Sequence, residues 1–368
     1  MNTETIYLLA LQFLRGIGDI NAKSLISYCQ TAENVFKTPI SKLKKIPGIG
    51  QYTIQTLKHA SAGIKRAEEE LIFIQKNNFA VIPYFSDQYP ALLKHCADAP
   101  FILFSCGNIP KIETKIINIV GTRHATTYGK TIVEKLVEGL VEHGIIIASG
   151  LAYGIDIAAH KAAVTYGLPT IGVLAHGLDR IYPAAHKSIA QKMMEQGGLI
   201  TEFPSGTNPD KQNFPRRNRI VAGMSAATIV IESATSGGAM ITANIANSYN
   251  RDVFAFPGSI GSDYSAGCNL LIKENRAVLA ENAADILKHL GWDSEEKINK
   301  KYIQKDIFIE LDHHEQTIVH AIKNGKIYLE ELCSIFPEQQ SLIANILLQL
   351  EMKGVIQSLP GKRFRLVE

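Results

Sequence analysis

Short apolar runs alternate with amphipathic stretches through the middle of the chain, between residues 71 and 290. Most of these runs are continuously apolar, as is typical of strands covered on both faces. Between the first two runs, Ile132–Val141 repeats its apolar residues with a helical period. Repeated strand–helix units of this kind predict a parallel, doubly wound sheet. The five predicted strands are Ile116–Val120, Ile145–Ala148, Ile171–Leu174, Thr228–Ile231 and Val253–Phe256.

The N-terminal region has a different pattern, and residues 1–68 are predicted to be helical. Two of its segments, residues 14–22 and 46–54, each carry Gly-Ile-Gly before an amphipathic stretch. Glycines permit a tight turn and expose backbone N–H groups at a helix start. This is the chemistry of a helix-hairpin-helix phosphate contact. Two turns in a small helical module without a DNA contact remain the other interpretation.

The C-terminal residues 311–368 have the outline of a winged helix. Three helices are predicted near residues 313–324, 328–335 and 338–353. Leu359-Pro-Gly-Lys then signals the turn of a β-hairpin. A module that reads DNA and a small dimerisation or docking domain are both compatible with this outline.

These patterns predict an α/β protein with three modules. A Rossmann-like domain with a doubly wound, mostly parallel sheet is expected over residues 69–292. A small helical module of the helix-hairpin-helix or SAM-like kind precedes it at residues 1–68. Residues 293–310 are charged without an apolar period and are predicted to be a linker to the winged-helix-like module at residues 311–368.

Composition narrows the classes of function. The 368 residues are 46% hydrophobic and 20% charged, which is ordinary for a globular protein. The net charge of +3 excludes a histone-like polycation but allows a local nucleic-acid-binding patch. Five single cysteines without a CxxC pair argue against a zinc ribbon and favour a reducing cytoplasm. The apolar runs are all too short for a membrane span.

The first polar segment that follows a predicted strand is Gly121-Thr122-Arg123. Ligands collect outside the carboxyl ends of parallel strands, and we expect a helix to start just after this segment, near Tyr128. Backbone N–H groups and an arginine at a helix N-terminus would form an anion site. The nearby Gly129-Lys130-Thr131 is not a P-loop, because His124 occupies the position that requires glycine. The segment therefore predicts phosphate binding without a sign of triphosphate hydrolysis.

A cluster of cations surrounds one aromatic side chain and one amide further along the chain. Arginine binds phosphate in a bidentate manner, and an aromatic ring beside cations can stack on unpaired bases. The alternative is a solvated charged turn, but the apolar run that follows places the cluster against the domain. The cluster consists of Lys211, Phe214, Arg216, Arg217, Asn218 and Arg219.

Two pairs of polar residues suggest other chemistry. Asp156 and His160 are four apart and would share a helix face, but no third metal ligand accompanies them, so we interpret them as a structural pair. Glu202 and Glu232 could form a carboxylate pair for cleavage of a glycosidic bond. A carboxylate that caps helix N–H groups is the commoner explanation for Glu232.

At these residues the sequence resembles the DprA/Smf family of DNA-processing proteins, strongly over about residues 70–292. The order of the motifs makes a chance match improbable. The matching stretches are Val120-Gly-Thr-Arg123, Ser149-Gly-Leu-Ala-Tyr-Gly-Ile-Asp156, Thr201-Glu-Phe-Pro, Phe214-Pro-Arg-Arg-Asn-Arg219, Ser236-Gly-Gly-Ala, Phe256-Pro-Gly258 and Gly267-Cys-Asn-Leu-Leu-Ile272.

The resemblance implies a cytoplasmic protein that binds single-stranded DNA without cutting it and needs no cofactor or metal. It further implies protection of incoming strands during natural transformation, loading of the RecA recombinase, and a homodimer formed through the Rossmann-like domain. The family's phosphate motif carries over to Gly121, Thr122 and Arg123. Its basic–aromatic strip carries over to Lys211, Phe214, Arg217, Asn218 and Arg219.

An enzyme is the alternative expectation. Nucleotide phosphoribohydrolases of the lysine-decarboxylase-like group have a similar fold and carry Pro-Gly-Gly-x-Gly-Thr-x-x-Glu. The corresponding segment here, Thr235-Ser-Gly-Gly-Ala-Met-Ile-Thr, lacks that pattern. A DNA-cleaving enzyme would want a compact acidic cluster, which the sequence does not show.

Overall fold

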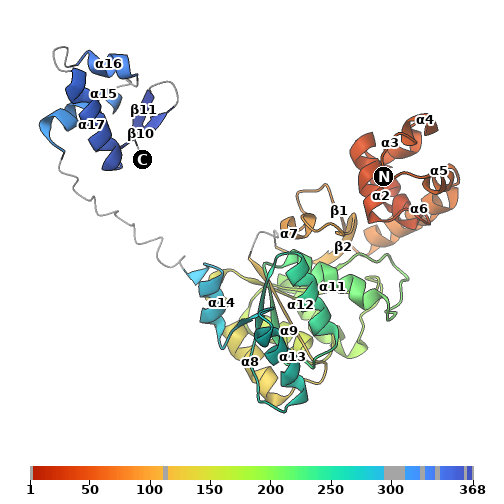
Figure 1. The fold of residues 1–368 in the computed structure, drawn as a ribbon. Helices are drawn as coiled ribbons and strands as arrows, with labels where there is room; N and C mark the ends of the chain where they lie inside the picture. The colour runs from red at the N-terminus through yellow and green to blue at the C-terminus, as the bar shows by residue number, and fades with distance from the viewer. Residues whose placement is uncertain are drawn as a thin grey trace. The chain divides into compact units, whose positions relative to one another are not determined.

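The computed structural model describes residues 3–110, 115–293, 311–323, 328–335, 340–359 and 363–366. The chain separates into two compact units, Met1–Asp293 and Ser294–Glu368 (Figure 1). The predicted linker, except for its first residue, lies outside the described residues. No helix of the described part is long and apolar enough to cross a membrane.

A nine-stranded sheet forms the centre of the first unit, in the order β1-β2-β6-β5-β4-β3-β7-β8-β9. β1 and β2 pair antiparallel and β2 joins β6 antiparallel, whereas the strands from β6 to β9 run parallel. All five predicted strands are confirmed, each displaced by one residue at most at either end. The strands are β1 (Ala80–Pro83), β2 (Ile102–Gly107), β3 (Ile116–Gly121), β4 (Ile146–Ser149), β5 (Thr170–Val173), β6 (Gly198–Thr201), β7 (Ala227–Ile231), β8 (Asp252–Ala255) and β9 (Val278–Leu279).

Helices cover both faces of this sheet (Figure 1). Side chains of a strand alternate between the faces, so Ile117 and Ile119 of β3 join one core while Ile116 and Val120 join the other. The first core contains α8 (Thr127–Glu138), α9 (Ile155–Tyr166) and α14 (Ala283–His289). The second contains α7 (Ala91–Lys94), α11 (Asn213–Met224), α12 (Gly238–Ser248) and α13 (Asp263–Lys273). α10 (Lys187–Gln196) packs beside α9.

The predicted helical stretch Ile132–Val141 is correct except at its end. α8 stops at Glu138, and Val141 begins a separate 3-10 turn, Val141–His143. Val141 is 41% exposed and does not belong to the buried stripe.

Helices also form the N-terminal region, but the expected boundary at residue 68 falls inside a helix. α6 continues to Lys76, and the helices share a core with Phe101 and Phe104, which lie at β2. The two Gly-Ile-Gly segments end at Gly18 and Gly50, the residues that precede α2 and α5. The helices are α1 (Thr3–Phe13), α2 (Asp19–Cys29), α3 (Ala32–Lys37), α4 (Ile40–Leu43), α5 (Gln51–Lys58) and α6 (Ser61–Lys76).

The second unit contains the predicted three helices and hairpin. Its helices pack around a small apolar core that includes Ile318, Leu347 and Leu350. The hairpin turn predicted around Leu359-Pro-Gly-Lys lies largely outside the described residues. The elements are α15 (His313–Lys323), α16 (Leu329–Cys333), α17 (Gln340–Met352) and the antiparallel strands β10 (Ile356–Leu359) and β11 (Arg363–Leu366).

Candidate nucleic-acid interface

A cleft of about 350 Å³ opens at the carboxyl ends of β3 and β7. These two strands are neighbours, but the chain proceeds from β3 to β4 on one side and from β7 to β8 on the other. The loops that follow the two strands therefore diverge, which leaves a crevice where ligands of open α/β sheets bind. The walls come from the loops after β3, β4 and β7, and from α11.

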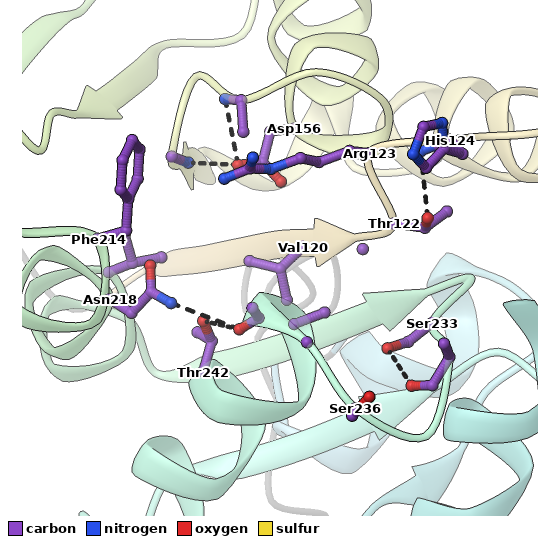
Figure 2. Close-up of a pocket in the computed structure, with 18 of the residues that line it drawn as sticks. Val120, Thr122, Arg123, His124, Asp156, Phe214, Asn218, Ser233, Ser236 and Thr242 are labelled. Carbon is purple, nitrogen blue, oxygen red and sulfur yellow. Dashed lines mark hydrogen bonds between the residues drawn. The ribbon is translucent and has the colours of Figure 1, made fainter. Parts of the chain in front are cut away.

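The loop after β3 brings the predicted phosphate motif into the cleft. Glycine is required at position 121, because a Cβ there would collide with the Ile231 carbonyl oxygen of β7. The next residue, Thr122, donates its backbone N–H to the Glu232 carbonyl oxygen at 2.6 Å, which holds the two loops together. Figure 2 shows the exposed Arg123 side chain running back across the cleft towards Phe214. The Arg123 Cζ atom lies 5.5 Å from the centre of that ring.

The helix N-terminus expected to assist this loop is not free to bind phosphate. α8 begins next to Thr126, whose backbone N–H donates to the Glu232 carboxylate at 2.9 Å. Thr126 itself caps α8, because its hydroxyl oxygen accepts the Gly129 N–H at 3.3 Å. The Glu232 carboxylate beside this cap would repel a phosphate. This helix N-terminus is therefore less suited to an anion than the sequence predicts, and Glu232 acts through Thr126 and does not cap the helix N–H groups itself. α12 instead opens at the cleft, and its start at Gly237 has no side-chain cap.

The cationic cluster does not form one strip, because residues 213–224 are helical. Positions three and four apart on a helix share a face. Phe214, Arg217 and Asn218 accordingly line the cleft, whereas Arg216 and Arg219 do not. Lys211 precedes α11 and is exposed outside the cleft lining.

Arg216 and Arg219 both interact with the buried carboxylate of Glu202. Their Nη2 atoms lie 2.9 and 2.6 Å from its Oε2 atom. Arg219 also contacts Asp19 of α2 at 3.2 Å and donates to the Asp98 carbonyl oxygen. Both arginines are predicted from the sequence to contact nucleic acid. In the structure both pair with Glu202, and Arg219 also connects the N-terminal helices to the sheet.

Arg217 lies below the cleft with 5% of its surface exposed. Its Nη1 atom donates to the carbonyl oxygens of Gly150 and Val173. Burial lowers the pKa of its guanidinium to about 10, an effect that nearby Asp156 opposes and Arg123 reinforces. The guanidinium remains charged at neutral pH, so it adds positive potential beneath the cleft.

Asp156 and His160, which the sequence predicts to be a structural pair, bond to different partners. The Asp156 carboxylate accepts the backbone N–H groups of Gly150 and Ala152 at 3.1 and 3.4 Å, which shapes the loop after β4 (Figure 2). His160 Nδ1 lies 2.7 Å from the Thr170 hydroxyl oxygen. Within the described residues, no group of three or more His, Cys, Asp or Glu could hold a metal ion.

Glu202 and Glu232 are too far apart to act as a glycosidase pair. Each follows the end of a strand, β6 and β7 respectively, and β5, β4 and β3 lie between them. Four strand spacings amount to about 19 Å at ~4.8 Å each. Paired carboxylates for glycosidic cleavage are about 5–10 Å apart.

Tyr264 and Tyr182 are side chains of the site that the sequence patterns did not single out. Tyr264 lines the cleft, and its ring stacks on His124 with 6.1 Å between centroids. The half-exposed Tyr182 lies 6.3 Å from Phe214. The only sequence signal for Tyr264 is its position three residues before the Gly267 motif.

Comparison with known proteins gives one consistent result. Residues 80–291 match the family model described as DNA recombination-mediator protein A. Protein Smf of Synechocystis is 30% identical over 99% of both chains, and Protein Smf of Escherichia coli is 34% identical over 86% of both.

Two solved structures have the same fold. DNA processing protein A from Streptococcus pneumoniae superposes with a TM-score of 0.65 at 33% identity, covering 77% of this chain and 97% of that one. The Helicobacter pylori protein, whose structure concerns its single-stranded DNA binding mode, gives 0.53 at 27% identity and covers 58% and 96%. From its sheet, its cleft and these matches, the chain belongs to the DNA recombination-mediator protein A family, also known as DprA/Smf.

Proposed function

We propose that the chain binds single-stranded DNA in the cleft between β3 and β7. The observation that carries this proposal is the exposed guanidinium of Arg123 beside the ring of Phe214. Within the described residues Arg123 makes no ion pair, unlike Arg216 and Arg219. A phosphate can bind the guanidinium while an unpaired base stacks on the ring.

The other residues predicted to bind DNA are given roles according to where they lie in or beside the cleft. Gly121 and Thr122 present the backbone close to the strand, and Asn218 offers its amide from the wall of the cleft. Arg217 contributes charge from below, and Lys211 offers a phosphate contact at the edge. Because phosphate contacts and stacking both tolerate every base, binding has little sequence specificity. The Helicobacter pylori relative, described by its single-stranded DNA binding mode, supports this assignment.

The biological role proposed for this chain follows the family. It protects incoming single strands and helps to load the RecA recombinase during natural transformation and recombination, without catalysis of its own. The N-terminal helices act as a helix-hairpin-helix module and residues 311–368 as a winged helix. The three helices and hairpin of the second unit support the latter assignment.

A homodimer formed through the Rossmann-like domain is part of the proposal. β9 is at the edge of the sheet, and its Val278 and Leu279 side chains are 40% and 46% exposed. An exposed apolar edge strand is a template for pairing with another chain. In analytical ultracentrifugation the parent should sediment as a dimer and the Leu279→Lys variant as a monomer. If the variant has the same mass as the parent, β9 is not the dimer interface.

Binding of labelled oligonucleotides tests the main proposal. Single strands should bind more tightly than duplex, and affinity should fall as salt rises, because bound cations are released. Arg123→Ala should cost about 1.5–3 kcal/mol, the range of a hydrogen bond to a charged group. Arg216→Ala is the matched control, because its guanidinium faces Glu202 outside the cleft. Tighter duplex binding, or equal effects of the two variants, contradicts the proposal.

The same preparation tests the enzymatic alternative. Incubation with nucleoside monophosphates should release no free base, and incubation with single strands should leave them uncut. Release of base that Arg123→Ala abolishes would instead indicate a phosphoribohydrolase.

A further inference from the structure

Two further hollows continue from the cleft along α9. The first lies between the starts of α8 and α9; its lining includes Lys130, Tyr153 and Lys161, and it shares Arg123 and His124 with the cleft. The second lies between α9 and α10 and shares Lys161 with the first. Each hollow therefore adjoins the one before it.

Both hollows are positively charged. Their lining includes Arg123, Lys130, Lys161 and Lys192, all exposed, and none of the described residues that line them is Asp or Glu. No ion pair engages these four cations in the part of the chain that the structure describes. Uncompensated positive charge along a continuous depression attracts a polyanion.

Aromatic rings accompany this charge. Tyr153, at the mouth of the first hollow, is 49% exposed. Its ring meets the His186 ring edge-on, with 4.9 Å between centroids. His186 is buried and donates from Nδ1 to the Leu151 carbonyl oxygen at 2.9 Å, so it gives the tyrosine a fixed neighbour. A half-exposed ring held in this way can stack on a base.

We propose that single-stranded DNA leaves the cleft past Arg123 and continues along α9, with a base on Tyr153 and phosphates at Lys130, Lys161 and Lys192. This extension rests on the proposed function of the cleft. From Gly154 to Lys161 the helix rises about 10 Å. That length accommodates about three nucleotides at a stacked spacing of ~3.4 Å. The proposed binding site therefore holds more nucleotides than the cleft alone.

Affinity for strands of two lengths tests the extension with the full chain. Oligothymidylate of about 4 nucleotides should occupy the cleft, whereas one of about 16 should also reach α9. Tyr153→Ala should weaken binding of the long strand roughly 5- to 150-fold, the effect of one stacked base, and leave the short strand unaffected. Tyr153→Phe should bind normally. Lys161→Gln should lower the salt slope for the long strand by about 0.7.

Phe85→Ala and Lys288→Gln are the matched controls, because both side chains are exposed and lie outside the N-terminal helices, the cleft and the two hollows. If the Tyr153 and Lys161 variants bind the long strand like these controls while Arg123→Ala weakens both lengths, the extension is wrong and the cleft stands. Equal loss on short and long strands places Tyr153 in the cleft and also overturns the extension. Absence of single-strand binding by the parent protein overturns the proposed function itself.

Discussion

Replacement of Phe214 by alanine should weaken single-strand binding without loosening the fold. The ring is only partly buried, on the first turn of α11. The guanidinium carbons of Arg123 and Arg217 lie 5.5 and 5.9 Å from its centre. Loss of one stacked base should cost about 1–3 kcal/mol, a roughly 5- to 150-fold rise in Kd.

The dependence of binding on salt separates stacking from charge. Phe214 carries no charge, so Phe214→Ala should shift the plot of log affinity against log salt without changing its slope. Arg123→Ala should reduce that slope by about 0.7, the value of one phosphate contact on a single strand. Fluorescence anisotropy of labelled oligothymidylate at several salt concentrations gives both quantities. Phe214→Tyr, which keeps a ring, is the control and should bind like the parent.

Two results would refute this reasoning. Unchanged affinity of Phe214→Ala at every salt concentration means that no base stacks on the ring. A slope reduced as much as in Arg123→Ala means that the ring acts by holding the guanidinium in place, so that the lost interaction is electrostatic.

Three other predictions concern stability and the separate units. Burial lowers the pKa of His160 to about 3, so the folded state binds fewer protons than the unfolded state between that value and about 6.5. The contribution of neutral His160 to the free energy of unfolding should be fully present above pH ~6.5 and fall by up to about 5 kcal/mol towards pH 3. Urea unfolding at several pH values should show a shallower fall for His160→Asn than for the parent. The same pH dependence in both proteins would contradict the lowered pKa of His160. Arg219→Met should lower the free energy of unfolding by about 1.5–3 kcal/mol, the range of a hydrogen bond to a charged group, because Arg216 still faces Glu202. The variant should bind DNA like the parent, and lost binding by the folded variant would return Arg219 to the interface. A chain ending at Asp293 should bind single strands nearly as well as the full chain, because it is a compact unit; a folded truncation without affinity would show that the second unit is required.

The central strands could be predicted because burial on both faces leaves a direct trace in the sequence. β3 and β7 are almost continuously apolar, and the apolar runs predict the ends of both strands to within one residue. β6 gives no such signal, because Leu199 and Ile200 are its only strongly apolar residues, and β9 has only two residues. The antiparallel pairing of β1 and β2 depends on contacts between distant segments, which no local pattern specifies.

The sequence predicts which loops form the candidate site, but not how their side chains are arranged and paired. The rule that ligands bind at the carboxyl ends of strands selects the loop at Gly121, and this loop lines the cleft. It could not tell which helix N-terminus remains free, because the carboxylate that lies against the start of α8 belongs to Glu232, 106 residues from Thr126. Only the adjacency of β3 and β7 brings these two residues together, and that adjacency follows from the strand order.

The cations of α11 illustrate why charge read from sequence overstates charge available to DNA. Arg216 and Arg219 share Glu202, and Arg217 is buried against backbone carbonyl oxygens. Of the cluster, only Lys211 is both exposed and without an ion pair among the described residues. Since the salt slope counts only phosphates neutralised at the surface, α11 and its approach should contribute about one contact, roughly 0.7. A strip of four free cations would contribute about four times as much. The helical arrangement predicts that Lys211→Gln lowers the slope by about 0.7 and that Arg216→Gln leaves it unchanged, whereas the strip predicts a loss of about 0.7 for each variant.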